Sequence, residues 1–92
     1  MTITWDFLFK FHKMFKDVSA EIIEYLVFHG GHFEGSYREF AIALGKNEDQ
    51  YSNIHGYVKE LCEIGVLRTT VDRYTVVELK PDWMEVIMND GN

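Results

Sequence analysis

The sequence predicts a single α+β domain, in which a mostly helical core is followed by a β-hairpin and a short last helix. Three observations predict this. Capping and stop signals divide residues 4–65 into amphipathic helical segments. Residues 66–79 are rich in Val and Thr, as short strands are. The hydrophobic content of 47% over 92 residues supplies one core. We divide the chain into an N-terminal aromatic helix (1–17), a core (18–79) and a C-terminal helix and tail (80–92).

The composition narrows the class of protein. The single cysteine, Cys62, excludes an intramolecular disulfide and a cysteine-based zinc site. No apolar run approaches the roughly eighteen residues of a membrane span. Residues 1–17 are apolar but lack the basic segment and cleavage site of a signal peptide. We therefore expect a cytoplasmic protein that does not contact a membrane.

The first helix is predicted over residues 4–16 and is unusually aromatic. One helical stripe carries Trp5, Leu8, Phe11 and Phe15, with Phe7, Phe9 and Met14 beside it. Such a helix either packs across the core of its own subunit or contributes part of its surface to a homodimer. The sequence leaves both readings open, and the stripe is the candidate dimerisation element.

The second helix is predicted from about Val18 to His29, with Asp17 or Ser19 as N-cap and Gly30-Gly31 after its end. Its core-facing residues are Ile22, Ile23, Leu26 and Val27. The following segment, HFEG, suits either a loop or a very short strand.

Two further helices follow in quick succession. Ser36 and Glu39 form a capping box, and Gly45 ends that helix in a left-handed conformation. Asn47 and Gln50 are spaced as a second capping-box pair opening the next helix, which Gly65 ends. The predicted inward faces consist of Phe40, Ala41 and Leu44 in the first helix, and Tyr51, Ile54, Val58, Leu61 and Cys62 in the second.

Near the end of the chain, the hydrophobic pattern changes to the period of two that is typical of strands. Residues 66–71 and 74–79 read as two strands of a tight hairpin, with Asp72-Arg73 at its turn. Pro81-Asp82 then marks a break before a short helix that contains Trp83, Val86 and Ile87. The predicted order is four helices, two strands and one helix.

With these elements in place, the region 18–79 resembles the winged helix-turn-helix DNA-binding domains of bacterial, archaeal and phage regulators and replication initiators. The resemblance rests on three motifs: Ser36-x-x-Glu39-Phe40-Ala41-x-x-Leu44-Gly45, then Ile54-x-x-x-Val58-x-x-Leu61, then Gly65-Val66-Leu67 with the hairpin. It implies a DNA-binding transcriptional regulator. The helix of about 47–64 would enter the major groove, and the hairpin of about 66–79 would contact the minor groove or the backbone.

The resemblance also implies which residues contact DNA. Ser36, Tyr37, Arg38 and Lys46 would lie against phosphates. The outward side of the recognition helix carries Gln50, Ser52, Asn53, His55 and Lys59, of which Gln and Asn suit adenine. In the wing, the candidates are Arg68, Thr69 and Arg73.

Some features depart from this pattern. The formal net charge is −6, Glu48 and Asp49 open the recognition helix, and Gly56 stands where relatives often carry an arginine. A winged-helix module that binds protein is therefore the alternative function, and a phage or mobile-element replication protein is a variant of the first. No nucleophile–base pair or phosphate loop is evident, so we expect neither catalysis nor a cofactor. His29 and His32 are too few ligands to predict a metal site.

Overall fold

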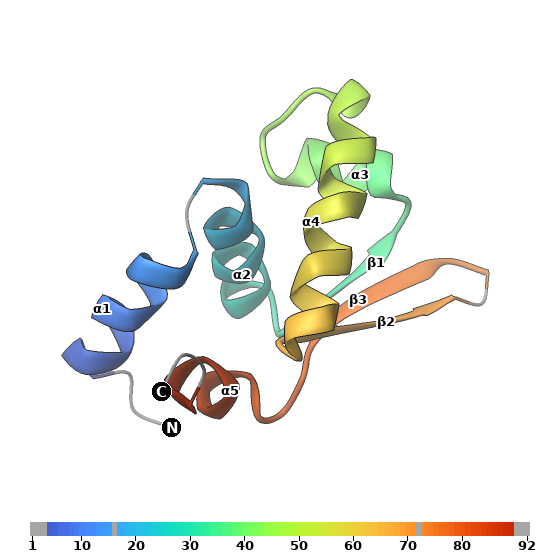
Figure 1. Ribbon diagram of the computed structural model, residues 1–92. Coiled ribbons are helices and arrows are strands. Elements are labelled where there is room, and N and C mark those ends of the chain that lie inside the picture. The colour runs from blue at the N-terminus through green and yellow to red at the C-terminus, as the bar shows by residue number, and fades with distance from the viewer. Residues whose placement is uncertain (1–3, 16, 72, 90–92) are drawn as a thin grey trace.

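The computed structural model describes residues 4–15, 17–71 and 73–89. Over these residues the chain is α+β, with five α-helices and one small antiparallel sheet (Figure 1). The elements are α1 (Trp5–Met14), α2 (Val18–Phe28), β1 (His32–Gly35), α3 (Tyr37–Ala43), the 3-10 turn η1 (Glu48–Gln50), α4 (Tyr51–Ile64), β2 (Leu67–Val71), β3 (Thr75–Leu79) and α5 (Trp83–Asn89). Within this part of the chain, no helix is long and apolar enough to cross a bilayer.

The sheet has three strands where the sequence predicts two. The strand order is β1-β3-β2, and both pairings are antiparallel. The HFEG segment is strand β1, in which Phe33 pairs with Val77 of β3. The alternative of a loop is therefore wrong, because β3 offers its second edge to this distant segment. The hairpin strands pair as far as Val71 with Thr75; Asp72, the predicted turn residue, lies outside the described residues.

One hydrophobic core includes both terminal helices. Phe7 and Phe11 of α1 are buried with Ile87 of α5 in the same cluster as the centres of α2, α3 and α4. The Phe7 ring meets the edge of Trp83 at a centroid distance of 5.6 Å. In Figure 1, α1 and α5 accordingly lie together beside α2. The terminal helices are thus part of the folded unit.

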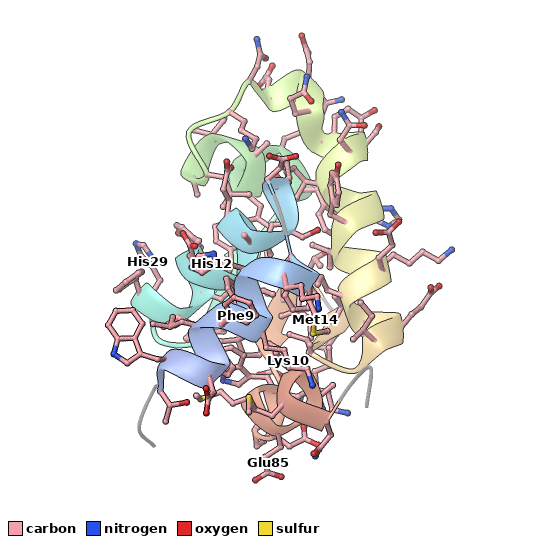
Figure 2. The ribbon with its side chains drawn as sticks, turned by 60° about the vertical axis from the view of Figure 1, so that its left-hand side comes forward. Phe9, Lys10, His12, Met14, His29 and Glu85 are labelled. Atoms are coloured by element: carbon pink, nitrogen blue, oxygen red, sulfur yellow. The ribbon has the colours of Figure 1, made fainter. Side chains whose placement is uncertain are left out.

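This packing contradicts the prediction that all four residues of the stripe on α1 are available for dimerisation. Phe11 and Phe15 are only 5% exposed, because their rings contact each other inside the chain's own core. They are not available to a partner in this fold. Leu8 is half-buried, and Trp5 remains on the surface. The outward side of α1 instead includes Phe9 (Figure 2).

The predicted capping and end residues are confirmed for α3 and only in part for α4. The Ser36 hydroxyl accepts a hydrogen bond from the Glu39 amide at 3.1 Å, and Glu39 Oε1 accepts one from the Ser36 amide at 3.1 Å. Gly45 takes a positive φ of 79°, as its stop position requires. The prediction of a second capping box from Asn47 and Gln50 is wrong. Asn47 caps the Asp49 amide of the 3-10 turn, and this tighter winding keeps Gln50 from reaching back.

Candidate nucleic-acid interface

Helix α4 separates a buried face from an exposed one. Ile54, Val58 and Leu61 are fully buried, so the opposite side is directed to solvent. Near the centre of that side lie Ser52, Gly56, Lys59 and Glu63, all exposed. In Figure 1, α4 lies alongside α3, and the β2–β3 hairpin extends away from the end of α4. The exposed face of α4 therefore stands free, with α3 and the hairpin as its neighbours.

The start of α3 is joined to the first half of α4 by two ring contacts. The Arg38 guanidinium lies 4.1 Å from the centre of the Tyr51 ring. Tyr37 meets His55 edge to face, with the ring centroids 4.9 Å apart. Burial raises the pKa of the Tyr37 hydroxyl, with a smaller contribution from Cys62, so this hydroxyl stays protonated at neutral pH. Tyr51 is thus half in the solvent and holds Arg38, contrary to its predicted place on the buried face.

Stacking on Tyr51 orients Arg38 without neutralising its charge. A guanidinium that lies flat on a ring keeps its N–H edges free to donate hydrogen bonds. The Ser36 hydroxyl oxygen accepts the capping-box bond and keeps its O–H as a single neutral donor. Of the residues predicted to meet phosphates at this end of α3, Arg38 is therefore the best placed.

The predicted base-reading residues lie around the start of α4. Asn53 Nδ2 donates a hydrogen bond to Gln50 Oε1 at 2.7 Å, so the two amides hold each other in place. Each amide keeps further donor or acceptor capacity. Ser52 lies beside them and is exposed. Glu48 and Asp49 precede this group and are exposed as well, so a polyanion approaching it meets two negative charges.

Salt bridges occupy two of the predicted DNA contacts, Lys46 beside the phosphates and Arg68 in the wing. Lys46 Nζ lies 2.8 Å from Glu21 Oε2, which directs it toward α2. Arg68 pairs with Glu78 on the neighbouring strand β3. The remaining predicted cations are Arg38 on the Tyr51 ring, Lys59, which Glu60 and Glu63 follow on α4, and Arg73 at the exposed tip of the hairpin. Among the described residues, these cations therefore do not form a continuous unpaired row along the face of α4.

Cys62 is a partly buried residue of α4, the helix that packs on β2 and its residue Thr69. Thr69 is exposed on β2, as the prediction of a wing contact requires. Burial raises the pKa of the thiol; Glu63 also raises it, whereas the Thr69 hydrogen bond lowers it. Cys62 therefore stays a neutral thiol at neutral pH and is a poor nucleophile or metal ligand.

The histidines near the end of α2 have ordinary structural contacts. His29 stacks on Tyr25 with the ring centroids 3.9 Å apart, and its Nδ1 lies 2.7 Å from the Tyr25 carbonyl oxygen. His32 is an exposed residue of β1. Throughout residues 4–15, 17–71 and 73–89, no three His, Cys, Asp or Glu side chains gather in a way that could hold a metal ion.

Sequence reasoning missed two features of this surface. It placed Tyr51 in the core, whereas its side chain is partly exposed. The i, i+3 spacing shows which side of the helix Tyr51 lies on, but not that the first turn of α4 extends beyond the elements that cover the rest of that side. It also gave no weight to Phe28, which is 80% exposed at the end of α2. Its position after the inward residues Ile22, Ile23 and Leu26 was the available signal, since a helix turns Phe28 away from them.

Comparison with known proteins adds no assignment: no protein-family model, curated protein or solved structure matches this chain.

Proposed function

We propose that this chain is a winged helix-turn-helix protein that binds double-stranded DNA and acts as a transcriptional regulator. The observation that carries the proposal is the exposed polar side of α4, which lies next to α3 and is followed directly by an exposed hairpin. The element order from α2 to β3 and the strand order β1-β3-β2 are compatible with a winged helix. Such a module presents one helix to the major groove and a hairpin beside it.

In this proposal, the three parts of the surface have separate tasks. Gln50 and Asn53, already oriented by their mutual hydrogen bond, would read base edges from the start of α4. Arg38, held on the Tyr51 ring, would contact a phosphate. Arg73 would reach the backbone or minor groove from the hairpin tip. Because Lys46 and Arg68 are paired with carboxylates, each subunit has few phosphate contacts, and two subunits would be needed for tight binding.

The acidic residues around α4 favour a second candidate function, a module that binds another protein through this helix. Glu48, Asp49, Glu60 and Glu63 are all exposed around the proposed reading face. A chain with a net charge of −6 repels DNA at long range but does not oppose a basic protein partner. Binding to random duplex DNA at low salt distinguishes the two functions.

We expect the chain to shift duplex DNA in a mobility assay at about 50 mM salt. The affinity should fall at least about tenfold at 200 mM, because counterions compete for the phosphates. Replacing Asn53 and Arg73 together by alanine should weaken binding at least about tenfold further, since one base contact and one phosphate contact are lost. Lys80→Ala is the matched control: it removes a positive charge after β3, away from the tip. Unchanged binding in the double variant would exclude the proposed surface, and absence of any shift would favour the protein-binding module.

Gly56 provides an independent test of which face meets the partner. A methyl group added there would meet no atom of the chain within 4 Å, so internal packing does not require a glycine in the middle of α4. We expect Gly56→Ala to raise the free energy of unfolding by about 0.5–1 kcal/mol, because alanine restricts the unfolded chain and favours a helix. The same variant should bind DNA more weakly, because its methyl group enters the contact.

Urea unfolding and the mobility assay measure these two effects separately. Gly65→Ala is the contrasting substitution: Gly65 has a φ of 100°, so alanine should destabilise the protein there. A Gly56→Ala protein that is more stable and binds equally well would place Gly56 outside the contact.

A further inference from the structure

Within the part of the chain that the structure describes, the three most exposed aromatic side chains lie on α1 and at the end of α2, on other elements than the proposed DNA surface. Trp5, Phe9 and Phe28 are 86%, 75% and 80% exposed. Three aromatic side chains with these exposures present on the order of 400 Å² of surface. That is within the range of about 300–600 Å² found for the largest patch of a monomer, and such patches are usually functional. We call this surface the aromatic face.

The aromatic face combines projecting rings with an adjacent groove. The groove lies between α1 and α2, has a volume of about 350 Å³ and contains the apolar side chains of Leu8, Phe11, Val27 and Phe28. Leu8 and His12 border both this groove and the hollow beside Trp5 and Phe9, so the two surfaces are continuous. Figure 2 shows α1 with Phe9 and His12 labelled along it. An apolar cavity of about 150 Å³ holds benzene, so the groove has room for one aromatic side chain.

The charges beside these rings are arranged for self-association. On α1, Asp6 lies in the first turn and Lys13 in the last, and both are exposed. If two α1 helices pair antiparallel about a two-fold axis between positions 9 and 10, Asp6 of one copy lies opposite Lys13 of the other. The symmetry repeats this pair, so one rotation satisfies both charges in each subunit. In a parallel pair, Asp6 would instead face Asp6, and Lys13 would face Lys13.

We propose that the partner of the aromatic face is a second copy of this chain. The two α1 helices pair antiparallel, and Trp5 or Phe9 of each copy enters the groove of the other. A stable interface needs about 800 Å² from each partner, of which the three aromatic residues supply roughly half. Leu8, His12, Lys13 and Val27 surround them and add to this area. This dimer does not depend on DNA binding, because its residues lie on other elements than α4 and the hairpin.

Sedimentation over a range of concentrations tests this proposal. We expect the mass to change from monomer to dimer between about 1 and 100 µM, as befits an interface near the lower end of the stable size range. Phe9→Ser and Trp5→Ser should each weaken the dimer at least about tenfold, because each substitution removes two buried rings per dimer. Val71→Ser is the control, since Val71 is an equally exposed apolar residue of the hairpin. A monomer at every concentration overturns the proposal.

Charge reversal tests the antiparallel arrangement. Asp6→Lys and Lys13→Asp should each weaken the dimer severalfold, because each places like charges opposite one another twice. The double variant restores opposite charges and should regain most of the lost affinity. A double variant weaker than both single variants would overturn the antiparallel pairing.

A disulfide provides a second readout, because it traps even the weakened dimer that remains when Phe9 is replaced. In a Cys62→Ala background, Phe9→Cys places two thiols next to the two-fold axis, and we expect an oxidised dimer on a non-reducing gel. Asp17→Cys is the control, as an exposed position outside α1. Equal cross-linking of both cysteines would overturn the proposed geometry. DNA binding by the monomeric variants is measured separately. Absence of the dimer would therefore not by itself exclude the proposed DNA surface.

Discussion

Replacing Phe11 by alanine is expected to lower the free energy of unfolding by about 3–5 kcal/mol, the range for deleting a buried Phe side chain. Phe11 is 5% exposed and its ring contacts Phe7 and Phe15 in the core. Domains of this size are stable by only about 5–15 kcal/mol, so such a loss would leave the protein marginally folded. Urea unfolding followed by circular dichroism measures the effect.

The matched control for Phe11→Ala lies two residues away on the same helix. Phe9 is the same residue type but 75% exposed, so Phe9→Ala should change the free energy of unfolding by no more than about 0.5 kcal/mol. Both variants are measured at about 1 µM protein, where association contributes little. Equal losses in the two variants would show that α1 does not pack against the core as described.

Phe40→Ala is expected to cost a similar 3–5 kcal/mol, and in addition to release β1 from the sheet. Phe40 is 1% exposed and stacks on Phe33 of β1 at a centroid distance of 4.5 Å. It also meets Tyr25 of α2 edge to face at 5.7 Å. This ring therefore joins α2, β1 and α3. Without it, β1 keeps its four backbone pairings with β3 and the contact of Phe33 with the Tyr25 ring, but loses the closer stacking partner of Phe33.

Amide hydrogen exchange separates the local effect of Phe40→Ala from the global one. Exchange in β1 should accelerate more than exchange in β2 under conditions where the protein stays folded. Ile42→Ala is the control, because Ile42 lies on the same helix and is 57% exposed. Uniform acceleration in both strands would mean that Phe40 stabilises the core as a whole and does not hold β1 in particular.

The candidate interface was predictable where contacts are close in sequence. The Ser36–Glu39 capping box could be read directly, because an α-helical first turn brings residues three apart together. The Asn47–Gln50 pair has the same spacing but starts a 3-10 turn, whose tighter winding the spacing does not reveal. The partner of Lys46 could not, because Glu21 lies on another helix and only packing of α2 against the turn brings the two together. The same holds for Arg38, whose contact with Tyr51 depends on how α3 crosses α4.

The sequence by itself determined the α+β class, the order of the helices and the residues that end them, because caps, glycines and periodicity act within a few positions. It also determined that Ile54, Val58 and Leu61 are buried, since their spacing places them on one side of a helix. Only the tertiary structure decided that HFEG is a third strand, that Phe11 and Phe15 belong to the core and that Phe9 and Phe28 do not. Those outcomes depend on which distant surfaces meet, and every ring on an aromatic helix competes for the same limited core. That competition left the aromatic face exposed, and we infer that a second copy of the chain covers it.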